Sequence, residues 1–260
     1  MRALFDLQKS DGFGDDDLRA GSPHREESAL SGGAAVVLAD AGSVWEIKPT
    51  HARNIVTAFA RLDGRPVGII GNNPMYVAGM LDSNACDKMA HFVAICDPFG
   101  LPLIYLIDVP GNAIGSAAER AGLGRRSGRM LFELGCATVP RLSVVLRRGY
   151  GGAFIMMNGG QPSFGAEGSF IWPSAEICAM SVEGSVDVAY RSDYANAADP
   201  AARRQALIDG IRRNLGPLRA AAHFHIDDVI DPRDTRPVLI RTLADAPPRR
   251  PARGYPRHRA

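Results

Sequence analysis

The chain has 260 residues, enough for one large α/β domain, and its hydrophobic and charged fractions of 46% and 22% are ordinary for a globular protein. A formal net charge of +2 is too small to indicate nucleic acid as a partner. No apolar run approaches the roughly 18 to 20 residues of a membrane-spanning helix, so no membrane partner is expected. Four cysteines without a C-x-x-C pair, and an amino terminus without a signal sequence, favour a reducing cytoplasm and disfavour a metal site.

In chain order, residues 1–36 come first and are rich in Gly, Asp, Ser and Arg. This composition is typical of a loosely held leader, or of an arm that packs on a partner. The last segment, residues 246–260, carries five arginines and four prolines, which predicts a solvated, disordered tail. Its charge also allows contact with an acidic partner. The sequence therefore predicts one domain over residues 37–245.

Strands and helices alternate within this domain. The predicted elements are strand 66–70, helix 82–96, strand 103–108, helix 127–137, strand 142–146, a short helix 153–158, an extended piece 169–172 and a long helix 200–215. A flexible glycine-rich lip is expected at 122–128, which has one residue too many for G-x-G-x-x-G and follows no strand. The alternation predicts a mostly parallel sheet, and the short repeat favours a spiral of β-β-α turns over a doubly wound sheet.

A glycine-bearing turn follows each of the two most apolar strands. The first strand, 103–108, runs into Val109-Pro110-Gly111, and the second, 142–146, runs into a turn over 147–153 that ends in Gly151-Gly152-Ala153. Loops at the carboxyl ends of neighbouring parallel strands open onto one crevice, where ligands bind. Each turn also has a purely structural interpretation. A Pro-Gly turn is common at the end of a strand, and paired glycines let a helix pack closely on a strand.

The second turn is the stronger candidate site. The main-chain N–H groups of Gly152 and Ala153 begin a predicted helix, so they are unpaired and suited to hold an oxyanion. The chain contains no G-x-S-x-G, H-E-x-x-H or P-loop motif, and no nucleophile or general base stands out. His223 and His225 have the spacing of one strand face but no third ligand, which favours structural roles. A base supplied by the substrate or by a cofactor is therefore expected.

Several segments together carry a family resemblance. They are 52–56, 59–65, 67–74, 108–111, 137–140, 150–153, 172–177 and 226–236. On these motifs, residues 37–243 resemble the carboxyl-terminal half of the carboxyltransferase (β) subunit of biotin-dependent acyl-CoA carboxylases, of the propionyl-CoA and acetyl-CoA type. The resemblance implies a crotonase-like fold, in which two such domains face each other across a dimer and the other domain holds the acyl-CoA.

The resemblance also assigns roles to residues. It implies that the amides of Gly152 and Ala153 bind the ureido oxygen of biotin, whose ring nitrogen then takes the α-proton of the thioester. The cofactor-binding residues that it implies are Pro110, Gly111, Tyr150 and Gly151. Phe154 and Ile155 fall in the acyl pocket, where Ile155 suits an uncharged acyl group.

The sequence departs from the family pattern in two ways. We expect the amino-terminal carboxyltransferase domain to be absent from this chain, and Asn112, Gly124, Arg126 and Ser181 replace residues usual in the family. The leading hypothesis is one half of a split acyl-CoA carboxyltransferase, active in a hetero-oligomer with an amino-terminal-type carboxyltransferase subunit and a biotin carboxyl carrier protein. The alternatives are a decarboxylase or other thioester-enolate enzyme of the same fold, and a non-catalytic scaffold half.

Overall fold

A computed structural model describes residues 31–159, 166–222 and 226–247. Eight strands form one sheet in the order β1-β2-β3-β4-β5-β6-β8, and β7 pairs with β5 off this path. The strands are β1 (Trp45–Glu46), β2 (Ile55–Leu62), β3 (Arg65–Asn72), β4 (Leu103–Val109), β5 (Arg141–Tyr150), β6 (Gly168–Ile171), β7 (Glu176–Cys178) and β8 (Asp228–Val229).

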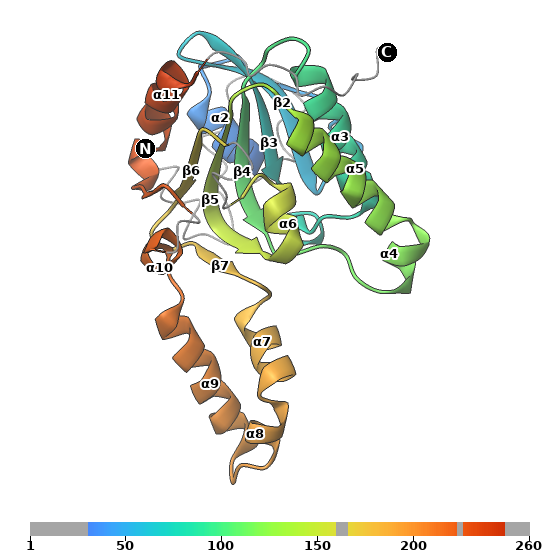
Figure 1. Cartoon of the computed structure of the whole chain (residues 1–260), viewed down its shortest axis with the longest axis vertical. Coiled ribbons are helices and arrows are strands. Elements are labelled where there is room, and N and C mark those ends of the chain that lie inside the picture. The colour runs from blue at the N-terminus through green and yellow to red at the C-terminus, as the bar shows by residue number, and fades with distance from the viewer. Residues whose placement is uncertain (1–30, 160–165, 223–225, 248–260) are drawn as a thin grey trace.

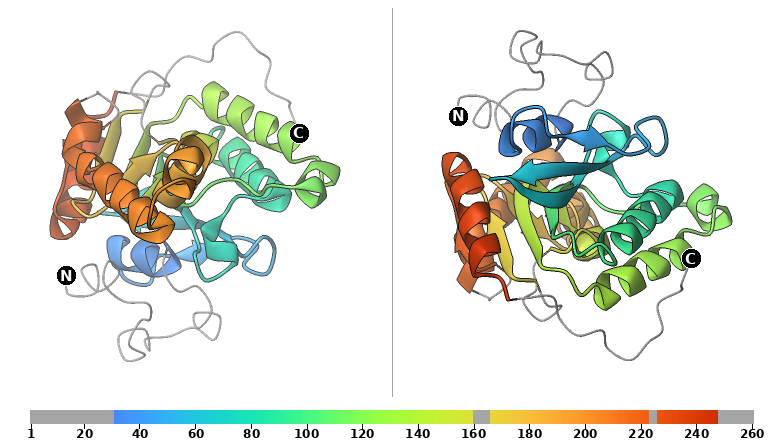
Figure 2. Two further views of the ribbon diagram at one scale, coloured as in Figure 1. Left: turned by 90° about the horizontal axis from the view of Figure 1, so that it is seen from below. Right: turned by 90° about the horizontal axis from the view of Figure 1, so that it is seen from above.

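Helices surround this sheet (Figures 1 and 2). They are α2 (Ser31–Leu38), α3 (Ser83–Cys96), α4 (Ser116–Arg120), α5 (Leu123–Cys136), α6 (Gly151–Met156), α7 (Val182–Ala189), α8 (Arg191–Ala195), α9 (Pro200–Asn214), α10 (Pro217–Ala222) and α11 (Thr235–Asp245), with short 3-10 turns η1 (Val77–Gly79) and η3 (Pro232–Asp234). Helices α3 and α5 pack against each other, while α2 packs on β2, β3 and β4.

The sheet begins with an antiparallel hairpin and continues with parallel strands. β2 and β3 are joined by Asp63-Gly64, both with positive φ, the conformation that tight hairpin turns require. The Asp40 carboxylate accepts hydrogen bonds from the main-chain N–H of both turn residues, at 2.9 and 2.7 Å. From β3 onward the pairs β3–β4, β4–β5 and β5–β6 are parallel. Every residue of β4 is buried, as expected for a parallel strand covered on both faces.

Helix α5 begins at Leu123, so the flexible lip expected over 122–128 is wrong. Gly122 is the N-cap in a left-handed conformation, φ 71°, and the helix runs on through Gly124 and Gly128. Leu123, Met130 and Leu134 bury one face of this helix, whereas a Cβ on either glycine would meet only open space. Burial of the apolar face therefore outweighs the low helix propensity of the glycines.

Strand β5 is longer than the predicted strand 142–146, because it continues to Tyr150. Its first half pairs with β6, and its last residues, Arg148 to Tyr150, pair with the short strand β7. The polar residues that suggested a turn at 147–150 are thus the paired end of a strand. Their charges are met by Asp108 at the end of β4.

A helical arm, formed by α7, α8 and α9, projects from the body of the protein (Figure 1). It has a small core of its own, in which Val182 and Val186 pack against Ile208. Three ion pairs link its helices: Arg204–Asp187, Arg203–Asp193 and Arg212–Glu183. Asp199 caps α9 by accepting a hydrogen bond from Ala202 N at 3.0 Å.

The predicted boundary at residue 36 falls inside helix α2. Ala34, Ala35 and Leu38 of this helix are buried in the main core, and the neighbouring Asp40 forms an ion pair of 2.7 Å with Arg236 of α11. The body therefore includes residues from 31 onward, six more than predicted. Residues 1–30, most of the predicted tail, and both His223 and His225 lie outside the described residues. Within the described ranges, the helices are all too short or too polar to span a bilayer.

Candidate active site

The carboxyl ends of β4 and β5 lie side by side, as the sequence predicts. Val109 pairs with Gly149, after a register shift between Ile107 and Val109. A three-residue cluster joins these ends: the Asp108 carboxylate, only 6% exposed, contacts Arg147 Nη2 at 2.8 Å and Arg148 Nε at 3.0 Å. One buried carboxylate thus holds two guanidinium groups in place, and these three groups together carry one net positive charge.

The Pro110-Gly111 turn is held by a neighbouring loop. Leu81 N donates to Gly111 O at 3.0 Å, and Ala113 N donates to Leu81 O at 2.8 Å, so the turn is paired like a short parallel strand. Gly111 has φ 139°, and a Cβ there would meet nothing within 4 Å. The main chain at Gly111 is therefore open to a close approach, which only glycine permits in this conformation.

Asn72, at the end of β3, stabilises the Val109-Pro110-Gly111 turn. Its side-chain Oδ1 accepts a hydrogen bond from Asp108 N at 3.0 Å, and its Nδ2 donates to Gly79 O at 3.0 Å. Asn72 is fully buried and makes both bonds within the core. Sequence reasoning missed this residue, because its neighbours in Gly71-Asn72-Asn73-Pro74 are typical of an exposed turn.

The second turn begins helix α6. Gly151 has φ 60°, and a Cβ there would lie 3.0 Å from Ala179 O, so both conformation and space require glycine. Gly152 and Ala153 follow in the first turn of the helix, where main-chain N–H groups have no partner within the helix. Gly152 is exposed, whereas the Ala153 side chain is completely buried. The surface of this turn is therefore formed by main chain.

Tyr150, just before the turn, is anchored rather than open. Its hydroxyl donates a hydrogen bond to Glu176 Oε2 at 2.7 Å, and the residue is only 7% exposed. Burial and the neighbouring Glu176 raise the pKa of Tyr150, so its phenol is neutral at ordinary pH. Glu176 comes from β7, and no local sequence pattern predicts its contact with Tyr150. This hydrogen bond fixes the strand end from which Gly151 and Gly152 extend.

Phe154 and Ile155 have different surroundings, although both are predicted to line the substrate pocket. Phe154 is buried in the core, and one edge of its ring packs against two glycines: a Cβ on Gly149 would be 2.6 Å from the ring, and one on Gly159 would be 2.1 Å away. Phe154 therefore anchors α6 to the core, and little of its side chain is exposed to a ligand. Ile155 is 38% exposed on the outer side of α6, so a pocket-lining role remains open to it.

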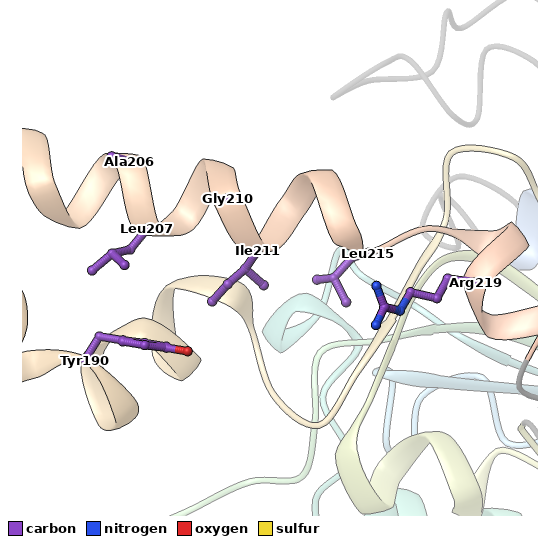
Figure 3. A pocket seen from close by; sticks show the side chains of 7 residues that line it. All are labelled: Tyr190, Ala206, Leu207, Gly210, Ile211, Leu215 and Arg219. Carbon is purple, nitrogen blue, oxygen red and sulfur yellow. The ribbon is translucent and has the colours of Figure 1, made fainter.

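A hollow of about 450 Å³ lies elsewhere, on the helical arm (Figure 3). Its lining residues are Tyr190, Ala206, Leu207, Gly210, Ile211, Leu215 and Arg219. The side chains of Leu207 and Ile211 point from α9 toward the Tyr190 ring (Figure 3). This hollow shares no residue with the two predicted turns.

Three relatives match most of the chain. The methylmalonyl-CoA carboxyltransferase 12S subunit of Propionibacterium freudenreichii subsp. shermanii is 42% identical over 222 residues, which are 85% of this chain and 42% of that protein. The methylmalonyl-CoA decarboxylase subunit alpha of Propionigenium modestum is 38% identical over 204 residues, 78% of this chain and 39% of that protein. The biotin-dependent acetyl-/propionyl-coenzyme A carboxylase beta5 subunit of Mycobacterium tuberculosis is 39% identical over 221 residues, 79% of this chain and 39% of that protein.

A solved structure agrees with these relatives. The crystal structure of transcarboxylase 12S, with methylmalonyl-coenzyme A and methylmalonic acid bound, superimposes with a TM-score of 0.79 at 42% identity, covering 85% of this chain and 43% of that one. The predicted crotonase-like fold is thereby confirmed. The chain spans about two fifths of the length of the relatives that it matches. The model of the carboxyl transferase domain matches residues 35–259, and the chain therefore belongs to the carboxyl transferase domain family.

Proposed function

We propose that this chain supplies one half of an acyl-CoA carboxyltransferase site. In this proposal the half binds biotin carried on a separate protein, and the amides of Gly152 and Ala153 hold the ureido oxygen. An amino-terminal-type carboxyltransferase half holds the acyl thioester, and the two halves form a hetero-oligomer. The free thiols of Cys86 and Cys96 are consistent with a reducing cytoplasm as its location. The observation that carries the proposal is the exposed main chain of Gly152, in a chain 42% identical to a carboxyltransferase subunit over 222 residues.

The surroundings of the glycine turns fit the cyclic head group of biotin. Both Gly111 and Gly152 present open main chain, since a Cβ at Gly152 would meet only Asn112, at 3.7 Å. The Pro110-Gly111 and Tyr150-Gly151 segments would flank the group, and the first-turn amides of α6 would donate to its oxygen. When bound, biotin supplies a carboxyl group carried on a ring nitrogen.

The chain's own residues would then act through position and charge. The amides of Gly152 and Ala153 stabilise negative charge on the bound oxygen, where one such donor is worth about 3 to 4 kcal/mol of barrier. Phe154 and the Tyr150–Glu176 hydrogen bond fix the helix that carries these amides. The net positive charge of the Asp108, Arg147 and Arg148 cluster makes an anionic reactant more stable at this edge.

The proposal is tested by reconstitution. The full chain is mixed with the amino-terminal half of a 12S-type relative and a biotinylated carrier, and carboxyl transfer to propionyl-CoA is followed with a radioactive carboxyl donor. We expect transfer by the mixture and none by the chain alone. Gly152→Val is expected to abolish transfer while the complex still elutes as one species, because the valine side chain covers the exposed amides.

Gly135→Val is the matched control for this test. Gly135 is exposed on α5 and a Cβ there meets nothing within 4 Å, so the complex and its activity should be unchanged. Transfer by the isolated chain would refute the division of the site between two halves. Full activity of the Gly152→Val complex would show that the turn is vestigial and that the chain serves as a scaffold.

Decarboxylation is a second candidate function, favoured by the 38% identity to a methylmalonyl-CoA decarboxylase subunit. In this alternative, the amides of Gly152 and Ala153 hold the thioester oxygen and stabilise the enolate that forms when carbon dioxide leaves the α-carbon. Mass spectrometry of methylmalonyl-CoA, incubated with the complex with and without the biotinylated carrier, separates the two. Conversion to propionyl-CoA without carrier favours decarboxylation on the thioester itself.

A further inference from the structure

Asn112 lies beside the turn that carries the proposed oxyanion site. The residue follows Gly111, and its main chain is held in a parallel bridge to Leu81, which is fully buried. This bridge fixes the direction in which the Asn112 side chain leaves the loop. Its Nδ2 atom lies 3.7 Å from the position that a Cβ on Gly152 would take. The side-chain amide thus faces the exposed first turn of α6.

The two ends of this side-chain amide have different surroundings. Oδ1 is buried and accepts no hydrogen bond from any described residue, whereas Nδ2 is the end next to Gly152. Leaving a buried acceptor unpaired costs about 1 to 3 kcal/mol. The nitrogen is therefore the end of the side-chain amide that faces the first turn of α6, where the main-chain N–H groups are also donors.

An acceptor that binds at the α6 turn therefore lies within reach of the Asn112 side-chain amide. We propose that Asn112 Nδ2 donates a third hydrogen bond to the carbonyl oxygen that the Gly152 and Ala153 amides hold. The inference rests on the proposed function, because it takes the α6 turn as the oxygen's binding site. The ligand is a carbonyl oxygen that gains negative charge, supplied either by the cyclic urea of biotin or by an acyl thioester.

The full chain, labelled with ¹⁵N, is titrated with biotin methyl ester and, separately, with propionyl-CoA. Biotin methyl ester offers the urea without a carboxylate, and the side-chain NH₂ signals of Asn112 report directly on its hydrogen bonds. We expect these signals to move together with the main-chain amides of Gly152 and Ala153, with one dissociation constant. A response to the urea alone identifies biotin as the source of the oxygen, and a response to the thioester alone identifies the acyl group.

Asn112→Asp keeps the shape of the side chain and replaces the donor by a carboxylate, so we expect at least tenfold weaker binding. Asn196→Asp is the control on the exposed arm, where Nδ2 donates to Ser192 O, and its binding should equal that of the wild type. Movement of the Gly152 and Ala153 signals without Asn112, and unchanged binding by Asn112→Asp, would overturn this inference and leave the proposed function intact. No movement at Gly152 and Ala153 with either ligand would overturn both.

Discussion

Gly149→Ala tests whether close packing beneath α6 holds the candidate site in place. Gly149 lies in β5, and its added Cβ would be 2.6 Å from Cδ2 and 3.0 Å from Cε2 of the Phe154 ring. These distances are far below ordinary carbon contacts, so the ring or the strand must move. Phe154 is buried, and a Cβ on Gly159 would lie 2.1 Å from the same two ring atoms, so the ring is tightly packed along this edge.

The expected cost follows from this geometry. An extra methyl group in a packed core costs about 1 to 3 kcal/mol. The same substitution at Gly128, in the exposed face of α5, meets nothing within 4 Å and should stabilise the protein by about 0.5 to 1 kcal/mol. The two variants carry one identical chemical change, so the difference in unfolding free energy, about 1.5 to 4 kcal/mol, isolates the contact with Phe154.

Urea unfolding of the full chain, followed by circular dichroism, measures this difference. Phe154→Leu removes the ring atoms that the new methyl group meets, so the double variant should lose less stability than the sum of the single variants. The coupling expected between touching residues is about 0.5 to 3 kcal/mol. Equal stability of the Gly149→Ala and Gly128→Ala proteins, or strict additivity with Phe154→Leu, would refute the packing described here.

Three further outcomes are expected. Burial raises the pKa of the Cys96 thiol to about 12. The contribution of this group to the free energy of unfolding is therefore present below pH 9 and is lost as the pH rises through 12. In urea unfolding over this range, the free energy of unfolding of the wild type should fall by up to about 1.4 kcal/mol per pH unit more than that of Cys96→Ala. Burial lowers the pKa of Lys88 from 10.5 to about 8, so the unfolded chain binds more protons than the folded chain between pH 8 and 10.5. As the pH rises through this range, the free energy of unfolding of the wild type should increase relative to that of Lys88→Met. An unchanged difference between the two proteins over this pH range would contradict the expectation. Thr235→Val leaves the buried Trp172 Nε1–H without the acceptor that now lies 3.0 Å away, which should cost about 1 to 3 kcal/mol by thermal or urea unfolding; no loss would mean that the indole finds another partner.

Much of the fold can be predicted from the sequence, because its core strands are continuous apolar runs. The strand at 103–108 and the helix at 82–96 are found almost at their predicted ends, since burial and a side-chain cap at Asp82 determine both. Helix α5 and the end of β5 were mispredicted for one shared reason. Glycines and arginines are locally typical of loops, and only contacts with distant residues make them helix and strand here.

The main chain of the candidate site could be predicted from the sequence, but the side chains that hold this main chain in place could not. Glycines at 111, 151 and 152 indicate where main chain is exposed, because residue type alone limits what each can do there. The buried Asn72, the Tyr150–Glu176 hydrogen bond and the side-chain amide of Asn112 depend on which strand ends meet. The tertiary fold determines these contacts, so no local sequence pattern predicts them. The burial of Phe154 belongs to the same class.

Strand β5 belongs to two ladders, with β6 along its first half and β7 along its last residues. The chain leaves β7 directly into the helical arm and leaves β5 directly into the glycine turn. The arm and the turn are therefore joined by the few hydrogen bonds between two adjacent strand ends. A displacement of the arm therefore acts first on the main chain at Tyr150, one residue before the turn that begins α6.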